Sequence, residues 1–194
     1  MELTFSPKEF VDKTKKLLRT PEAFYKSVEK EKNWKEAFTY SIVISVVAAL
    51  FGVLEVTLLY PLFQNQLSGI FTPENKPQLL DVLPAFFVSA IIVVALGFVW
   101  SGALHLWLKL CRVKGDYWSA YKAYTYSRAP LSLFGWIPYI GVFFSLYSIY
   151  LLVVGMAVHY KISRKKAFLL VIIPLALLFV VQTVFYSVAT QSLP

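Results

Sequence analysis

Hydrophobic residues along this chain gather in long runs that short polar segments separate. Residues 37–60 contain a single charged side chain, Glu55, and the ranges 82–108 and 167–189 contain none. Each run exceeds the ~20 residues that an α-helix needs to cross the hydrocarbon core of a bilayer. The pattern therefore predicts a membrane-spanning helix over each of these three ranges.

The polar segments predict the orientation, because lysine and arginine are enriched in cytoplasmic loops. Residues 1–36 carry nine of these cations, 109–118 carry three and 161–166 carry four, whereas 61–81 carry only Lys76 and none follows Lys166. We therefore expect the N-terminus and the segments 109–118 and 161–166 to be cytoplasmic. The segment 61–81 and the C-terminus should be external.

The range 119–160 lies between two segments that are both expected inside, so it must cross the membrane an even number of times. Gly135 and Pro138 interrupt it around the interfacial residue Trp136, which is typical of a tight turn. We predict two compact spans, 119–135 and 138–160. A re-entrant hairpin satisfies the same parity, although such backbone is tolerated only where other helices bury it.

The predicted fold class is an all-α integral membrane protein, a bundle of five transmembrane helices with a short amphipathic N-terminal helical arm. The predicted parts are the arm at 1–36, the membrane domain at 37–189 with spans at about 37–60, 82–108, 119–135, 138–160 and 167–189, and an external tail at 190–194.

Composition agrees with this assignment and excludes several classes of function. Hydrophobic residues make up 58% of the chain and charged residues 15%, against about 45–50% and 25% in soluble domains. No apolar signal-peptide region precedes the first span, and a single cysteine, Cys111, excludes an internal disulfide and a cysteine-based metal motif. No phosphate-binding loop, zinc-protease motif or nucleophile elbow occurs. We expect no enzymatic activity, no cofactor and no metal site.

The N-terminal arm carries the pattern of an amphipathic helix. It begins with a capping box, Ser6-Pro-Lys-Glu9. An apolar stripe follows, with cations around it. The candidate membrane-surface residues are Phe10, Leu17 and Leu18 on the stripe and Lys13, Lys16 and Arg19 beside it. Such a helix lies on the cytoplasmic leaflet, with its cations facing anionic lipid headgroups, or it packs on the protein's own loops. The pattern fits both arrangements equally.

Polar side chains inside the predicted spans form the second candidate site. Arg128 is costly at bilayer depth unless it is paired or hydrated. Counted from the outer end of each span at 1.5 Å per residue, five polar groups fall roughly 10 Å below the outer boundary. They are Glu55, Ser89, Arg128, Ser145 and Gln182.

A stripe of tyrosines shares the helix face of Arg128, since Tyr117, Tyr121, Tyr124 and Arg128 follow one another at spacings of four, three and four. One interpretation is a polar path or pocket between helices that leads to a Glu55–Arg128 pair. The other is a structural ion pair that holds the helices in register, with the tyrosines serving as packing and interfacial belt.

Several short motifs together resemble the Yip domain family. They are Arg19-Thr-Pro-Glu-Ala-Phe24, Trp34-Lys-Glu-Ala-Phe38, Gly115-Asp-Tyr117, Tyr126-Ser-Arg-Ala-Pro130, Ile137-Pro-Tyr-Ile-Gly141, Tyr150, Gly155, His159 and Lys166-Ala167. The resemblance covers nearly the whole chain. It implies a bundle of five helices with a cytoplasmic N-terminus. Eukaryotic members are associated with Rab-type GTPases and vesicle traffic, but the arm here is short, so the chain is more similar to small prokaryotic members.

Three functions remain open from the sequence. The first is a non-enzymatic scaffold or adaptor in membrane organisation or trafficking, and the alternative is a small transporter or channel that uses the Glu55/Arg128 layer. An intramembrane enzyme is the least favoured, because no nucleophile–base or metal constellation occurs. The expected partners are the bilayer with its anionic headgroups, a second copy of the chain or a cytoplasmic protein, and no nucleic acid. The expected location is the plasma membrane.

Overall fold

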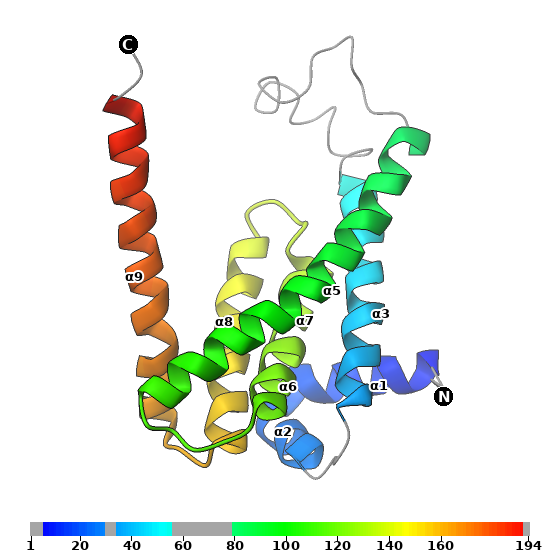
Figure 1. The fold of residues 1–194 in the computed structure, drawn as a ribbon. Coiled ribbons are helices and arrows are strands. Elements are labelled where there is room, and N and C mark those ends of the chain that lie inside the picture. The colour runs from blue at the N-terminus through cyan, green and yellow to red at the C-terminus, as the bar shows by residue number, and fades with distance from the viewer. Residues whose placement is uncertain (1–5, 30–33, 56–78, 192–194) are drawn as a thin grey trace.

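A computed structural model describes residues 6–29, 34–55 and 79–191 of the 194-residue chain. Throughout these residues the regular elements are helices (Figure 1). They are α1 (Pro7–Arg19), α2 (Pro21–Glu29), α3 (Lys35–Leu54), α5 (Leu79–Leu110), α6 (Tyr117–Ser127), α7 (Ala129–Phe134), α8 (Gly141–His159) and α9 (Arg164–Gln191). The prediction of an all-α membrane protein is confirmed.

Among the described residues, four helices are long and apolar enough to cross a membrane: α3, α5, α8 and α9. They lie where the apolar runs predicted spans, although the part of the first predicted span beyond residue 55 lies outside the described residues. The agreement has a simple cause. A backbone within the hydrocarbon core can satisfy its polar groups only as a helix, so these runs are helical even across Pro84 of α5 and Pro174 of α9.

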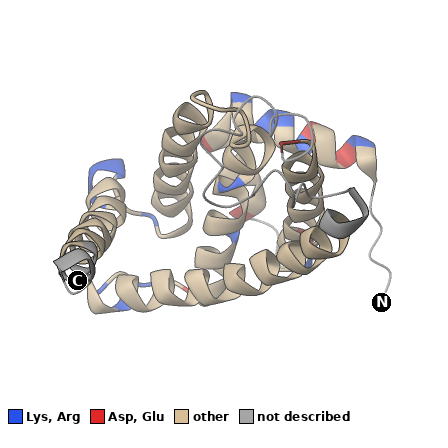
Figure 2. Cartoon of the chain, turned by 90° about the horizontal axis from the view of Figure 1, so that it is seen from above, with Lys and Arg blue, Asp and Glu red and all other residues tan. Residues whose placement is uncertain are grey.

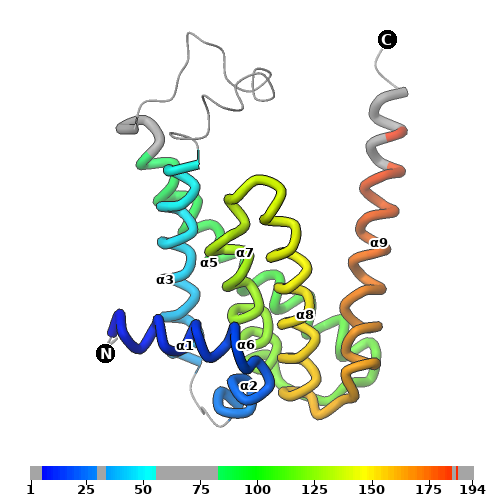
Figure 3. The backbone as a smooth tube through the Cα atoms, turned by 180° about the vertical axis from the view of Figure 1, so that it is seen from behind, coloured from blue at the N-terminus to red at the C-terminus, as the bar shows by residue number. Residues whose placement is uncertain are grey.

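The predicted third span, 119–135, is two short helices, α6 and α7, which meet at Arg128. Pro130 explains the break, because proline lacks the N–H of the helical ladder and its ring clashes with the preceding turn. Neither helix alone has the ~20 residues that a crossing needs. The turn between α7 and α8 also lies lower in Figures 1 and 3 than the far ends of α5 and α9.

Helix α6 occupies the centre of the bundle, packed against α3, α5 and α8. Helix α9 packs against α8, and the indole Nε1 of Trp107 on α5 donates to the Leu170 carbonyl of α9 at 2.9 Å. Beyond this base α9 stands away from the other helices (Figures 1 and 3). Its side chains from 175 to 184 are all exposed.

Helices α1 and α2 lie across one end of the bundle (Figure 1). The connections 111–116 and 160–163 are at this same end, and seen from above the lysines and arginines gather on α1 and at helix ends while the long helices are nearly free of them (Figure 2). We call this the basic end. Helix α1 begins as its capping box predicts, with the Ser6 side chain accepting a hydrogen bond from the backbone N–H of Glu9.

Candidate functional site

Helix α2 is inserted into the basic end against α6 and α8, and Tyr25 is its anchor. The Tyr25 side chain is 0% exposed, and its hydroxyl donates to the carbonyl of Ala123 at 3.4 Å. Its ring meets the edge of His159, with 5.7 Å between the ring centroids. A Cβ at Gly155 would lie 2.8 Å from the Tyr25 ring, so α8 must carry a glycine here for α2 to dock.

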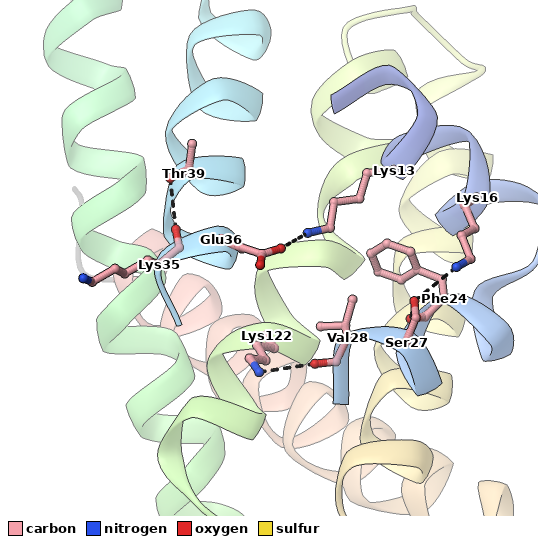
Figure 4. Close-up of polar contacts among 9 residues, drawn as sticks. All are labelled: Lys13, Lys16, Phe24, Ser27, Val28, Lys35, Glu36, Thr39 and Lys122. Atoms are coloured by element: carbon pink, nitrogen blue, oxygen red, sulfur yellow. Dashed lines mark hydrogen bonds and ion pairs between the residues drawn. The ribbon is translucent and has the colours of Figure 1, made fainter. Parts of the chain in front are cut away.

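The neighbours of Tyr25 on α2 are buried as well. The Phe24 ring packs edge-on against Tyr126, at 4.9 Å between centroids. Val28 is fully buried, and its carbonyl accepts a hydrogen bond from the Nζ of Lys122 at 3.3 Å (Figure 4). Because carbonyl groups in the last turn of a helix carry partial negative charge, the buried cation on α6 stabilises the end of α2.

Helix α1 also packs on protein through its apolar stripe. Leu17 is 0% exposed and belongs to the core, and the Thr14 hydroxyl lies 3.1 Å from the Tyr40 hydroxyl of α3. Phe10 is partly buried against the Tyr40 ring, and the Leu18 carbonyl accepts from the Tyr147 hydroxyl at 2.6 Å. The apolar stripe of α1 therefore packs on the protein's own helices, and contact of the cations around it with lipid stays a prediction. The expectation that Leu17 contacts lipid is wrong.

The cations predicted around the stripe have different surroundings. Lys13 pairs with Glu36 at the start of α3 at 2.6 Å, and the Nζ of Lys16 donates to the Ser27 hydroxyl at 3.3 Å (Figure 4). Arg19 is exposed. Two of the three cations therefore bind the arm to itself and to α3.

Ion pairs join α2 to the start of α9. Glu22 contacts both Lys26, at 2.8 Å, and Arg164, the first residue of α9. The hydrogen bond and charge of Lys26, together with the Arg164 charge, lower the pKa of Glu22. Burial raises the pKa of Tyr25 well above its ordinary value, so Tyr25 docks as a neutral phenol.

The tyrosines of the predicted stripe lie on the side of α6 that contacts α5. The Tyr117 hydroxyl donates to the Phe98 carbonyl at 3.0 Å, and the Tyr121 ring stacks on Phe98 at 4.7 Å. The Arg128 guanidinium lies 5.7 Å from the Tyr124 ring centroid, an arrangement in which the ring quadrupole attracts the cation. A Cβ built at Gly97 would lie 3.9 Å from Tyr124 and 4.0 Å from Arg128, which is ordinary van der Waals contact, so α5 passes directly beside this end of the stripe.

The predicted polar layer does not form. Glu55, Ser89 and Gln182 are exposed, and the Ser145 hydroxyl bonds to the Gly141 carbonyl of its own helix at 3.0 Å. Within the described residues, no ion pair joins Glu55 to Arg128. The expectation of a Glu55–Arg128 pair in a shared layer is wrong.

The heights of the two residues explain the error. Gly52, close to Glu55, packs against Phe86 of α5, whereas Arg128 faces Gly97. The eleven residues from Phe86 to Gly97 span about 16 Å along the helix, so Arg128 lies far below Glu55.

Three buried hydroxyl residues beside the stripe were not among the predicted site residues: Ser41, Ser45 and Thr125. The Tyr121 hydroxyl lies beside Ser41 of α3 and Thr125 of its own helix. The Ser45 Oγ and the Tyr121 hydroxyl are both buried in the contact between α3 and α6. The spacing of four in both pairs, 41/45 and 121/125, is a sequence signal that could have revealed this cluster.

Comparison with known proteins gives one match. A family model described as the Yip1 domain matches residues 15–185. No curated protein and no solved structure matches the chain. The matched range includes Tyr25, Arg128 and Gly155, so it contains both the docked arm helix and the tyrosine stripe.

Proposed function

The chain belongs to the Yip1 domain family, and on this premise we propose that it is a non-enzymatic scaffold or adaptor that acts through its basic end. It is a multi-pass membrane protein, and proteins of this family act in vesicle trafficking. A scaffold needs a surface of fixed shape rather than a reactive group. The basic end has such a surface.

The observation that carries the proposal is the burial of the arm. Leu17, Tyr25 and Val28 are fully buried, so α1 and α2 are part of the folded domain rather than a loose tail. Lysines and arginines outnumber the acidic residues on the exposed face of α1 and at the start of α9, where Lys8, Lys15, Arg19, Lys165 and Lys166 are exposed (Figure 2). The result is a rigid basic platform. Anionic lipid headgroups and acidic protein surfaces are the partners that its charge favours.

We place the basic end in the cytoplasm and the C-terminus outside, as the distribution of lysine and arginine favours. In this arrangement α6 and α7 together make the third of five crossings, broken at Arg128. Two supports exist for that crossing: α7 continues directly from α6, and α8 returns beside both of them. The plasma membrane is the proposed location.

The transporter alternative has lost its main support. It required a polar layer that reaches from Glu55 to Arg128, and the structure separates these residues. The hydroxyl cluster around Tyr121 is buried in the α3–α6 contact.

The proposal is tested by photocrosslinking in growing cells. A photoreactive amino acid replaces Lys15 or Lys165 on the basic platform, and Leu178 on the exposed apolar part of α9 is the matched control. If the chain is an adaptor, we expect one or more discrete protein adducts at the platform positions. These adducts should disappear when Lys8 and Arg19 are changed to Glu. Adducts that survive this charge reversal, or that form equally at Leu178, would contradict it.

A further inference from the structure

A groove runs between α3 and α5 on the outer surface of the bundle. It has a volume of about 480 Å³ and is lined by apolar side chains, among them Phe38, Ile42 and Val46 of α3 and Phe87, Ala95 and Phe98 of α5. The two helices meet closely near Gly52 and Phe86 and separate toward the basic end, as the strong tilt of α5 in Figure 1 shows. The groove therefore lies on the basic-end side of the Gly52–Phe86 contact.

Two aromatic rings bridge α3 and α5 at the end of the groove nearer the basic end. The Phe38 and Phe98 rings lie 5.8 Å apart, and Phe98 stacks on Tyr121 of α6 at 4.7 Å. The lining residues belong to α3 and α5, so the space is a groove in the side of the protein that opens sideways toward the surrounding lipid.

The length of the groove matches a lipid chain. Its walls extend from Phe98 to Phe87 on α5, and eleven residues at 1.5 Å each give about 16 Å. One leaflet of a hydrocarbon core about 30 Å thick is about 15 Å deep. An acyl chain that lies along the groove from the surrounding lipid would therefore match its length.

The basic end of the groove, beside Phe38, carries groups that suit a phospholipid headgroup. Trp34 stacks on Trp118 with 5.0 Å between centroids, and tryptophan pairs of this kind favour the headgroup level. Lys35 is exposed, shares a helix face with Phe38 and Ile42 by its spacing of three and four, and points away from the Lys13–Glu36 pair (Figure 4). A cation at this position attracts a headgroup of net negative charge.

A second copy of the chain fits the groove less well. Helices associate in membranes through small residues that let the backbones approach closely. The rims here carry large side chains instead, with Phe87 56% and Ile91 70% exposed. These rims would hold a partner helix away but leave room for a thin, flexible hydrocarbon chain.

We propose that the α3–α5 groove is a binding site for an anionic phospholipid of the leaflet at the basic end. Its acyl chain lies against Phe38, Ile42 and Phe98, and its headgroup lies beside Lys35 and Trp34. The site is separate from the exposed cations of the arm, and it does not depend on the adaptor function.

Native mass spectrometry of the purified full-length protein tests the site, with phosphatidylglycerol or phosphatidylcholine added to the detergent-solubilised sample. Ala95→Phe places a ring in the groove from an exposed position, and Ala176→Phe, on the exposed part of α9, is the matched control. We expect one phosphatidylglycerol to be retained per chain in the wild type and in Ala176→Phe, and at least a tenfold loss of retention in Ala95→Phe. Unchanged thermal stability of Ala95→Phe shows that the fold is intact.

The headgroup contact is tested in the same way. Lys35→Gln should reduce the preference for phosphatidylglycerol over phosphatidylcholine about fivefold, which is the effect of one cation near an anionic headgroup. Lys109→Gln, at the basic end of α5, should leave that preference unchanged.

Equal lipid retention by Ala95→Phe and Ala176→Phe would overturn the proposal. So would a disulfide-linked dimer formed by Ile91→Cys in a Cys111→Ser background, because it would assign the groove to a second copy of the chain.

Discussion

The docking of α2 should depend on the absence of a side chain at Gly155, and Gly155→Ala is the sharpest test of this arrangement. The added Cβ would lie 2.8 Å from the Tyr25 ring. The ring cannot move aside easily, because it is 0% exposed and packs between Phe24 and His159. The substitution should therefore loosen the arm and leave the long helices in place.

The expected size follows from the cost of forcing one extra carbon into a packed core, about 1–3 kcal/mol. That cost would raise the fraction of molecules with α2 undocked by a factor of roughly 5 to 150 if it falls on docking alone. Alanine also favours the helical state over glycine by about 1 kcal/mol, so α8 itself should gain stability. The loss should appear only in the arm.

Hydrogen–deuterium exchange with mass spectrometry measures this directly. Peptides that cover α2 should exchange faster in Gly155→Ala by the factor above, while peptides from α3 and α8 should keep their protection. Gly102→Ala is the matched control, since a Cβ there would lie 3.8 Å from Tyr117, at ordinary van der Waals distance.

Two results would refute the reasoning. If α2 in Gly155→Ala exchanges as slowly as in the wild type, the close approach of Tyr25 to α8 does not limit docking. If Gly102→Ala loosens α2 to the same extent, the effect comes from helix propensity or a general loss of packing.

Three further outcomes are expected. The melting temperatures of wild type and Glu22→Gln should differ at neutral pH and converge in acid. Lys26 and then Arg164 lower the pKa of Glu22, so the stability contributed by the ionised carboxylate is complete above the ordinary pKa of 4.5 and is lost as the pH falls through the lowered pKa. A constant difference at all pH values would contradict this. In a double-mutant cycle, the stability losses of Glu55→Leu and Arg128→Leu should add to within about 0.5 kcal/mol, because the residues do not meet. Recovery of stability in the double mutant would show instead that the two residues form an ion pair in the wild type. In a Cys111→Ser background, Tyr139→Cys, at a position 79% exposed in the α7–α8 turn, should react with an impermeant thiol reagent from outside the cell; labelling only after the membrane is opened would exclude a full third crossing.

The spacing of the tyrosines on α6 is a property of the sequence, but their contacts with α5 are not. Tyr117, Tyr121 and Tyr124 share a face wherever α6 is helical, because their spacing is a local property of the chain. That this face meets Phe98 and Gly97 of α5 depends on the tilt of α5, which no local pattern records.

The polar layer failed for a related reason. Its depths were counted along straight, uninterrupted spans, but Pro130 ends α6 at Arg128 and α9 leaves the bundle before Gln182. Each departure separates a side chain from its expected neighbours. The error in the predicted depth of the polar side chains therefore grows with every helix that the prediction includes.

The sequence by itself determined that the chain is helical and lies in a membrane, because a long apolar run can satisfy its backbone only as a helix there. It also determined where α1 begins and which faces of α1 and α6 are apolar or aromatic. Only the tertiary structure decided what those faces contact. An apolar stripe beside cations fits lipid and protein equally well, and the choice rests on the shape of distant segments: α2 is held because α8 has a glycine, Gly155, where Tyr25 needs space.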